Sequence, residues 1–173
     1  MYSKAKIFGH PIHPMLVGFP VAFYAASCVS YIAYAVGGVD VVWFKLAYFT
    51  NVAGVISAVI AAVPGFIDWA LGIPTGSRAK MTGMIHMFYN IVALILFGVS
   101  AVLNYSQMQL ATPHATMGVV LTLLGVGATL IGGFLGWKMV GTHHVGIDLS
   151  PEQERWEPLG QESSPRLRSG TGS

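Results

Sequence analysis

Four long apolar stretches constrain the fold of this chain more than any other feature of its sequence. They span residues 15–36, 46–67, 84–103 and 115–139. Each has about the 20 residues that a helix needs to cross a hydrocarbon core about 30 Å thick. Because no water is present there to satisfy backbone N–H and C=O groups, each stretch is expected to be a helix. We therefore predict an all-α fold, a four-helix transmembrane bundle of up-down topology.

The composition of the chain agrees with a membrane protein. Only 9% of its 173 residues are charged and its mean hydropathy is +0.63, whereas soluble domains contain about 25% charged residues. The net charge of +2 is too small to indicate a nucleic-acid partner. Cys28 is the single cysteine, which excludes an intrachain disulfide and a thiolate metal cage.

The two ends of the chain differ in character. Lys4 and Lys6 resemble the basic start of a secretory signal, but the apolar run that follows is longer than a signal core of about 7–15 residues. We therefore predict a retained first helix within a transmembrane domain of residues 1–147. Residues 148–173 are polar and rich in Glu, Arg, Ser, Pro and Gly, and this composition predicts a flexible tail.

Basic residues predict the orientation of the bundle. With four crossings, the N-terminus, the second loop and the C-terminus share one side of the membrane. That side carries most of the basic residues near the helix ends: Lys4, Lys6, Arg78, Lys80 and Lys138. The opposite side carries Lys45. The positive-inside rule therefore places both termini in the cytoplasm.

This topology brings histidines from distant parts of the chain to the cytoplasmic surface. They precede the first helix, begin the third and follow the fourth: His10, His13, His86, His143 and His144. Asp68 ends the second helix on the same side, whereas His114 lies on the opposite side. Convergence of five imidazoles and one carboxylate predicts a functional site, because ionisable groups near a membrane are functional candidates.

Prolines shape two parts of this surface. His10 and His13 are each followed by a proline, which fixes its own φ and drives the preceding residue toward an extended backbone. Helix is therefore expected only from Pro14 onward, and both histidines are expected on a short stiff segment before it. Pro64, with Gly65 after it, predicts a kink or an early end of the second helix.

The same residues carry a resemblance to a known family. Four motifs resemble bacterial membrane proteins designated domain of unknown function 2231: residues 10–14 (HPIHP), residues 64–68 (PGFID), His86 with Asn90 one turn later, and residues 136–147. In the last motif His143 takes the histidine position, and His144 stands where glycine is usual. The resemblance covers about residues 9–147 and implies a four-helix domain in the bacterial inner membrane.

The resemblance also implies a role in redox chemistry. Relatives in some bacteria are joined to Rieske iron–sulfur or cytochrome c domains, which implies respiratory electron transfer. The partners implied, besides the lipid bilayer, are redox proteins, subunits of a respiratory-type complex, or quinone. No established activity follows from the resemblance, and the chain is expected to be an electron-transfer or binding subunit rather than a stand-alone enzyme.

Three kinds of site would suit the predicted cluster. A site for Fe, Cu, Zn or Mn would draw on imidazole and carboxylate ligands: His10, His13, Asp68, His86, His143 and His144. A haem b site would use two axial histidines, His86 with His10 or His13, and Asn90 would orient His86 or a ligand. The third version holds no metal, because His and Asp side chains would relay protons beside a quinone pocket.

Each residue also has a structural interpretation. Histidines at helix ends bond lipid headgroups or backbone carbonyls, and His114 is expected to be structural. Asp68 could pair with Arg78 or Lys80 across a short loop. The leading hypothesis is therefore binding of haem b or a transition metal in membrane electron transfer. The alternative is a non-catalytic structural or assembly subunit of a larger membrane complex.

Overall fold

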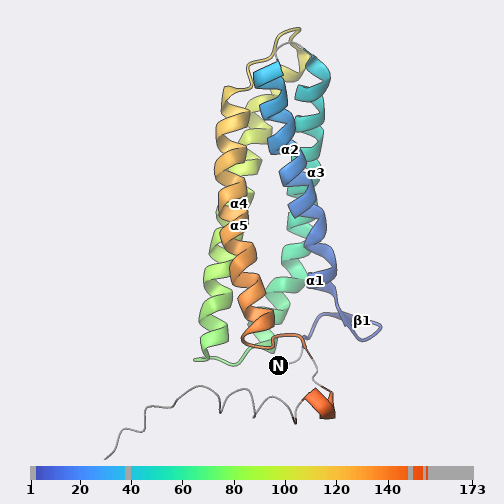
Figure 1. Cartoon of the computed structure of the whole chain (residues 1–173), viewed down its shortest axis with the longest axis vertical. Helices are drawn as coiled ribbons and strands as arrows, with labels where there is room; N and C mark the ends of the chain where they lie inside the picture. Colours follow the sequence, from blue (N-terminus) through green and yellow to red (C-terminus); the bar gives the residue numbers. More distant parts are fainter. Residues whose placement is uncertain (1–2, 38–39, 148–149, 154, 156–173) are drawn as a thin grey trace, which may run out of the picture.

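The computed structural model describes residues 3–37, 40–147, 150–153 and 155. Its four long helices lie side by side, and successive helices are joined at alternating ends (Figure 1): α2 Gly18–Gly37, α3 Val41–Ile67, α4 Arg78–Tyr105 and α5 Thr116–Gly141. With the short helical segments that extend them, all four are long and apolar enough to cross a membrane. The prediction of four helices long and apolar enough to span a membrane is thereby confirmed, whereas their topology and orientation in a membrane stay predictions. The predicted tail lies outside the described residues, except for residues 150–153 and 155.

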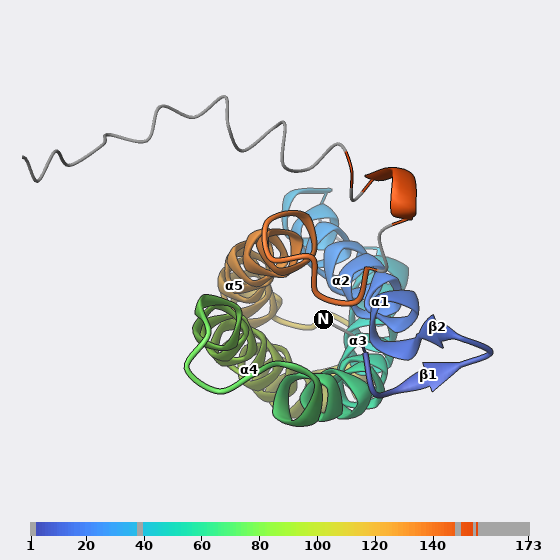
Figure 2. The same cartoon turned by 90° about the horizontal axis from the view of Figure 1, so that it is seen from below.

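The helices pack as two close pairs, α2 with α3 and α4 with α5. Viewed along its axis, the bundle is a ring of four helices (Figure 2). Aromatic rings fill the space over glycines of neighbouring helices, since a Cβ at Gly54 would lie 2.6 Å from Tyr24 and one at Gly125 would lie 2.5 Å from Phe97. Small residues therefore let these helices approach closely, as is common in membranes.

A short helix, α1 Ile12–Leu16, precedes α2. Helix thus begins at Ile12, two residues before the expected start at Pro14. Pro14 is tolerated there because N–H groups of the first helical turn have no partner within the helix. The break between α1 and α2 falls at Val17. Pro20 explains this break, because a proline clashes with the carbonyl four residues earlier, here that of Leu16. His13 therefore lies on α1, the short helix before this break.

The chain directly after the C-terminal end of α3 is wound more widely than an α-helix. Pro64 lies inside α3, so it does not end that helix early. The chain then continues as a π-helix, η1 Asp68–Gly72. Lys80 stabilises this end, because its Nζ donates to the carbonyl oxygens of Trp69, Ala70 and Ile73. A cation is favourable there, where helix carbonyls lack backbone partners.

Two helices begin before their apolar stretches because polar side chains cap them. Asp40 Oδ1 accepts from the Val42 N–H at 2.9 Å at the start of α3. Ser77 Oγ accepts from the Lys80 N–H at 3.1 Å at the start of α4. Such caps satisfy donors of the first turn, which apolar patterning does not register.

A small hairpin precedes α1, which the sequence had suggested only as an extended segment. Its strands are β1 Lys6–Ile7 and β2 His10–Pro11, paired antiparallel. A 3-10 turn, η2 Ser106–Gln109, follows α4 at the other end of the bundle.

Candidate functional site

His13 is held on α1 by a contact with α3. Its Nδ1 lies 2.8 Å from the carbonyl oxygen of Ala61. A carbonyl oxygen only accepts, so Nδ1 donates the proton. Gly65, one turn further along α3, makes room for the ring, because a Cβ there would lie 2.7 Å from Nδ1. The imidazole of His13 therefore has a fixed position between two helices.

His86 is held in the same way between α4 and α5. Its Nδ1 donates to the carbonyl oxygen of Gly132 at 2.7 Å. A Cβ at Gly136, one turn further along α5, would lie 3.1 Å from the ring. Asn90 lies one turn above His86, donates to its backbone oxygen at 2.8 Å, and places its amide nitrogen 3.3 Å from both ring nitrogens. The amide of Asn90 thus lies against the imidazole of His86, the ring that Asn90 was expected to orient.

These two imidazoles meet in the bundle. The ring centres of His13 and His86 are 6.3 Å apart, and the ring planes are nearly perpendicular at 86°. Both rings are partly buried. Because each Nδ1 carries the donated proton, Nε2 is the nitrogen that carries the lone pair when the imidazole is neutral. A neutral imidazole with a lone pair on Nε2 is the form that binds a metal ion.

Asp68 does not join the histidine pair. Its carboxylate accepts from Ser3 Oγ at 2.8 Å, from the Lys4 N–H at 2.6 Å and from the Ala5 N–H at 2.9 Å. These contacts replace the expected alternative, an ion pair of Asp68 with Arg78 or Lys80. Asp68 instead anchors the N-terminal segment. Ser3 is buried by this contact.

Replacing Asp68 by asparagine is expected to loosen the N-terminal segment. Hydrogen bonds to a charged acceptor contribute about 1.5–3 kcal/mol, so the Lys4 and Ala5 amides should exchange with solvent roughly 10-fold faster or more. Hydrogen exchange read by mass spectrometry on the detergent-purified protein measures this. Peptides from the middle of α4 serve as the internal control, and unchanged exchange at residues 4–5 would contradict the anchor.

The other predicted ligands have different surroundings. His10 is exposed on β2, opposite Ile7. His143 Nε2 lies 3.3 Å from Thr82 Oγ1, and His144 has a left-handed backbone with φ of 51°. Across the described part of the chain, no three His, Cys, Asp or Glu side chains are placed to share a metal ion. The expected six-ligand cluster is therefore reduced to His13 and His86, with Asn90 beside them.

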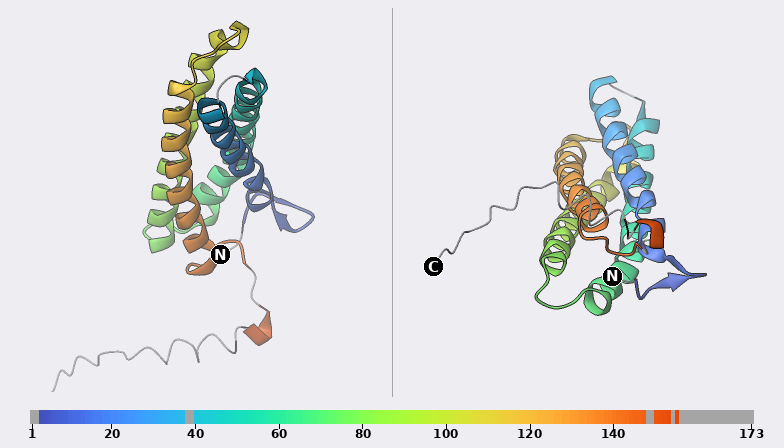
Figure 3. Two further views of the ribbon diagram at one scale, coloured as in Figure 1. Left: turned by 45° about the horizontal axis from the view of Figure 1, so that its top comes forward. Right: turned by 60° about the horizontal axis from the view of Figure 1, so that its bottom comes forward.

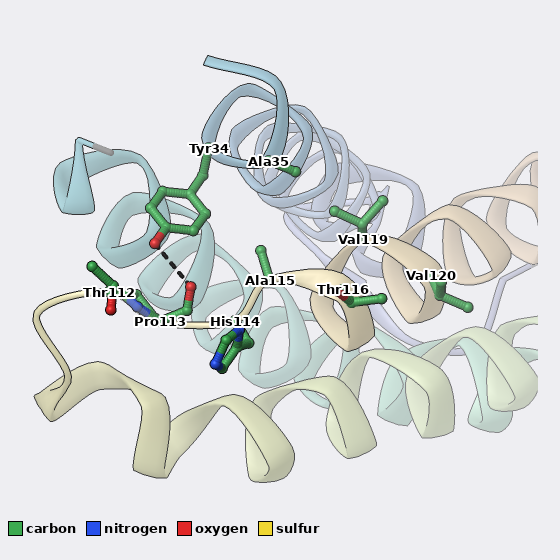
Figure 4. A pocket seen from close by; sticks show the side chains of 9 residues that line it. All are labelled: Tyr34, Ala35, Thr112, Pro113, His114, Ala115, Thr116, Val119 and Val120. Carbon is green, nitrogen blue, oxygen red and sulfur yellow. Dashed lines mark hydrogen bonds between the residues drawn. The ribbon is translucent and has the colours of Figure 1, made fainter. Parts of the chain in front are cut away.

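His114 lies at the opposite end of the bundle, as predicted. It is exposed and lines an open pocket of about 570 Å³ between α2 and the start of α5 (Figure 4). The Tyr34 hydroxyl donates to the carbonyl oxygen of Pro113 at 2.8 Å across this pocket, and the His114 N–H donates to Gln107 Oε1 at 3.1 Å. These contacts hold the loop before α5 against its neighbours.

The comparison with known families assigns the chain to a family. Residues 9–149 match the family described as predicted membrane protein (DUF2231). The chain belongs to this family. The resemblance inferred from the sequence motifs is thereby confirmed, and the DUF2231 match spans both His13 and His86. No curated protein and no solved structure matches the chain.

The glycines of this DUF2231 domain are the site residues that sequence reasoning missed. Gly132 and Gly136 lie one turn apart on α5, and their neighbours are the amide of Asn90 and the ring of His86. Gly65 indicated a kink, but it makes room for His13. A small residue one helical turn from a carbonyl acceptor was the available signal. This signal can be interpreted only when the side chain that faces the glycine from the neighbouring helix is known.

Proposed function

We propose that this protein is a membrane subunit that binds haem b or a single transition-metal ion between His13 and His86 and takes part in electron transfer. The observation that carries the proposal is the approach of two imidazoles from different helices, each with Nδ1 donating to a backbone carbonyl. Metal-bound histidines almost always donate their other ring N–H to such an acceptor, which fixes the tautomer and the ring orientation.

The separation of the rings agrees with a shared metal ion. His13 and His86 would hold one metal ion together, each through a ring nitrogen at the metal–nitrogen distance of about 2 Å. Their ring centres lie 6.3 Å apart. A site that forms without large movement of α1 and α4 binds with less loss of conformational entropy.

The number of ligands narrows the choice of metal. A structural zinc site uses four protein ligands, whereas the described residues offer no third His, Cys, Asp or Glu beside this pair. Haem needs only axial ligands from the protein, and imidazole also suits copper. Haem b or copper is therefore favoured over zinc. Either haem b or copper, when bound, would accept and donate one electron at a time.

The location of the pair supports an exchange of electrons at one membrane surface. His13 and His86 lie toward the end of the bundle at which the chain begins, together with Lys4, Arg78 and Lys80. By the positive-inside rule this end faces the cytoplasm, with the domain in a bacterial inner membrane and both termini inside. Redox proteins, subunits of a respiratory-type complex or quinone are the partners that this placement suits.

An absorption spectrum and a metal analysis of the detergent-purified protein test the proposal. We expect either a Soret band or about one copper or iron ion per chain, reduced by dithionite with a change of spectrum. Expression with added haem precursor and copper ensures that the supply of neither cofactor limits its binding. Neither cofactor in such protein would overturn the proposal.

That negative outcome would favour the second candidate, a structural or assembly subunit. A specific observation supports this candidate as well. The hydrogen bonds of His13 and His86 each join two helices, α1 with α3 and α4 with α5. Bonds of this kind stabilise helix pairs in membranes by about 1 kcal/mol. A subunit that only scaffolds a complex would need them without any metal.

A further inference from the structure

The tip of the N-terminal hairpin has an unfavourable backbone for its sequence. Strand pairing of Ile7 with His10 leaves Phe8 and Gly9 as a two-residue loop. Both loop residues have positive φ, 49° at Phe8 and 83° at Gly9. Two positive φ values define the type I′ turn, which favours Asn-Gly. A bulky phenylalanine is strained in this conformation, so the turn itself does not explain its presence.

The side chain of Phe8 also has no packing role within the described part of the protein. It is 97% exposed, and the neighbouring Ile7 is 54% exposed. An aromatic ring that stands in water forgoes the free energy that burial of its apolar surface would contribute. Strain at one position together with exposure of the same side chain points to a function outside the bundle.

The hairpin is held at the end of the bundle where α3 ends. The carboxylate of Asp68, directly after α3, binds the chain at Ser3, Lys4 and Ala5. The Ile12 N–H then donates to the carbonyl oxygen of Ala5 at 3.0 Å. From this anchor the hairpin projects sideways from the helices, not along their axis (Figures 2 and 3). A sideways projection at this level runs along a membrane surface.

We infer that this hairpin, residues 6–11, is a lipid-binding element that lies in the interface of an anionic leaflet. Phe8 and Ile7 enter the boundary between headgroups and acyl chains, where aromatic side chains concentrate. Lys4 and Lys6 are exposed on the same segment. Lysines near an anionic surface are attracted to it electrostatically. The apolar tip and the basic stem thus match the two layers of such an interface.

A spin label at residue 7 tests the depth of the hairpin in the full-length protein. The label is attached to Ile7→Cys in a Cys28→Ala background, which removes the single native cysteine, and the protein is reconstituted in vesicles of phosphatidylglycerol and phosphatidylcholine. Two reference labels define the scale, Val29→Cys on the lipid-facing side of α2 and Thr75→Cys in the exposed loop before α4. We expect oxygen and nickel accessibility at residue 7 to fall between these two references.

Phe8→Asn is the matched control, because Asn-Gly is the favoured type I′ sequence and keeps the turn while removing the apolar ring. In this variant the label at residue 7 should become several-fold more accessible to nickel and approach the Thr75 value. Lys4→Gln with Lys6→Gln should reduce the depth in phosphatidylglycerol vesicles and leave it unchanged in pure phosphatidylcholine. A label that matches Thr75 already with Phe8 in place would overturn the inference. So would a depth that does not respond to Phe8→Asn.

Discussion

With haem b or a metal ion bound between His13 and His86 as proposed, the His86→Ala variant is expected to have a haem or metal content at least 10-fold below that of the unaltered protein. The reason is that His86 supplies one of two imidazoles that meet at 6.3 Å, and one remaining ligand holds neither haem nor a metal ion firmly. His13→Ala should have the same effect. Absorption spectra and metal analysis, normalised to protein, measure the content of each variant.

His114→Ala is the matched control, because it removes the same side chain at the other end of the bundle, where no contact with the pair exists among the described residues. Its cofactor content should be unchanged. Circular dichroism and gel filtration show whether each variant still folds as a helical, monodisperse protein. Full cofactor content in His86→Ala protein that passes these checks would remove His86 from the site.

The four helices could be predicted because their signal is a property of single stretches. A run of about twenty apolar residues is long enough to cross the bilayer as a helix, whichever segments pack against it. The ends were less predictable, since Asp40 and Ser77 extend two helices by capping bonds. The hairpin of residues 6–11 was missed because two-residue strands carry no periodicity that a pattern could reveal.

The site was predictable only in part because topology gives the level of a residue and not its direction. His13 and His86 were expected to come together from distant parts of the chain, and their ring centres do lie 6.3 Å apart. Asp68 lies at the same level, but its carboxylate turns to Ser3 and to backbone N–H groups of the N-terminal segment. His10 was displaced from the pair because the chain before α1 turns outward as a strand. Side-chain direction depends on contacts between distant segments, which spacing along one segment does not contain.

The role of Gly65 can be tested by adding a single methyl group. In Gly65→Ala the new Cβ would lie 2.7 Å from Nδ1 of His13, so the ring must leave its hydrogen bond with Ala61. Overpacking of this kind costs about 1–3 kcal/mol. We therefore expect a lower thermal unfolding temperature and loss of most of the cofactor. Thermal unfolding followed by circular dichroism in detergent, together with the absorption spectrum, measures both effects.

Gly98→Ala separates this steric effect from helix propensity. A Cβ at Gly98 would meet nothing within 4 Å, and alanine is favoured over glycine inside a helix by about 1 kcal/mol. This control should therefore be as stable as the unaltered protein or more so, with full cofactor content. A double variant adds the decisive comparison, because once His13→Ala has removed the ring, Gly65→Ala should cost little or nothing. If Gly65→Ala destabilises the protein equally with and without the His13 ring, then Gly65 does not act by making room for that imidazole, and the fixed position of His13 must have another cause.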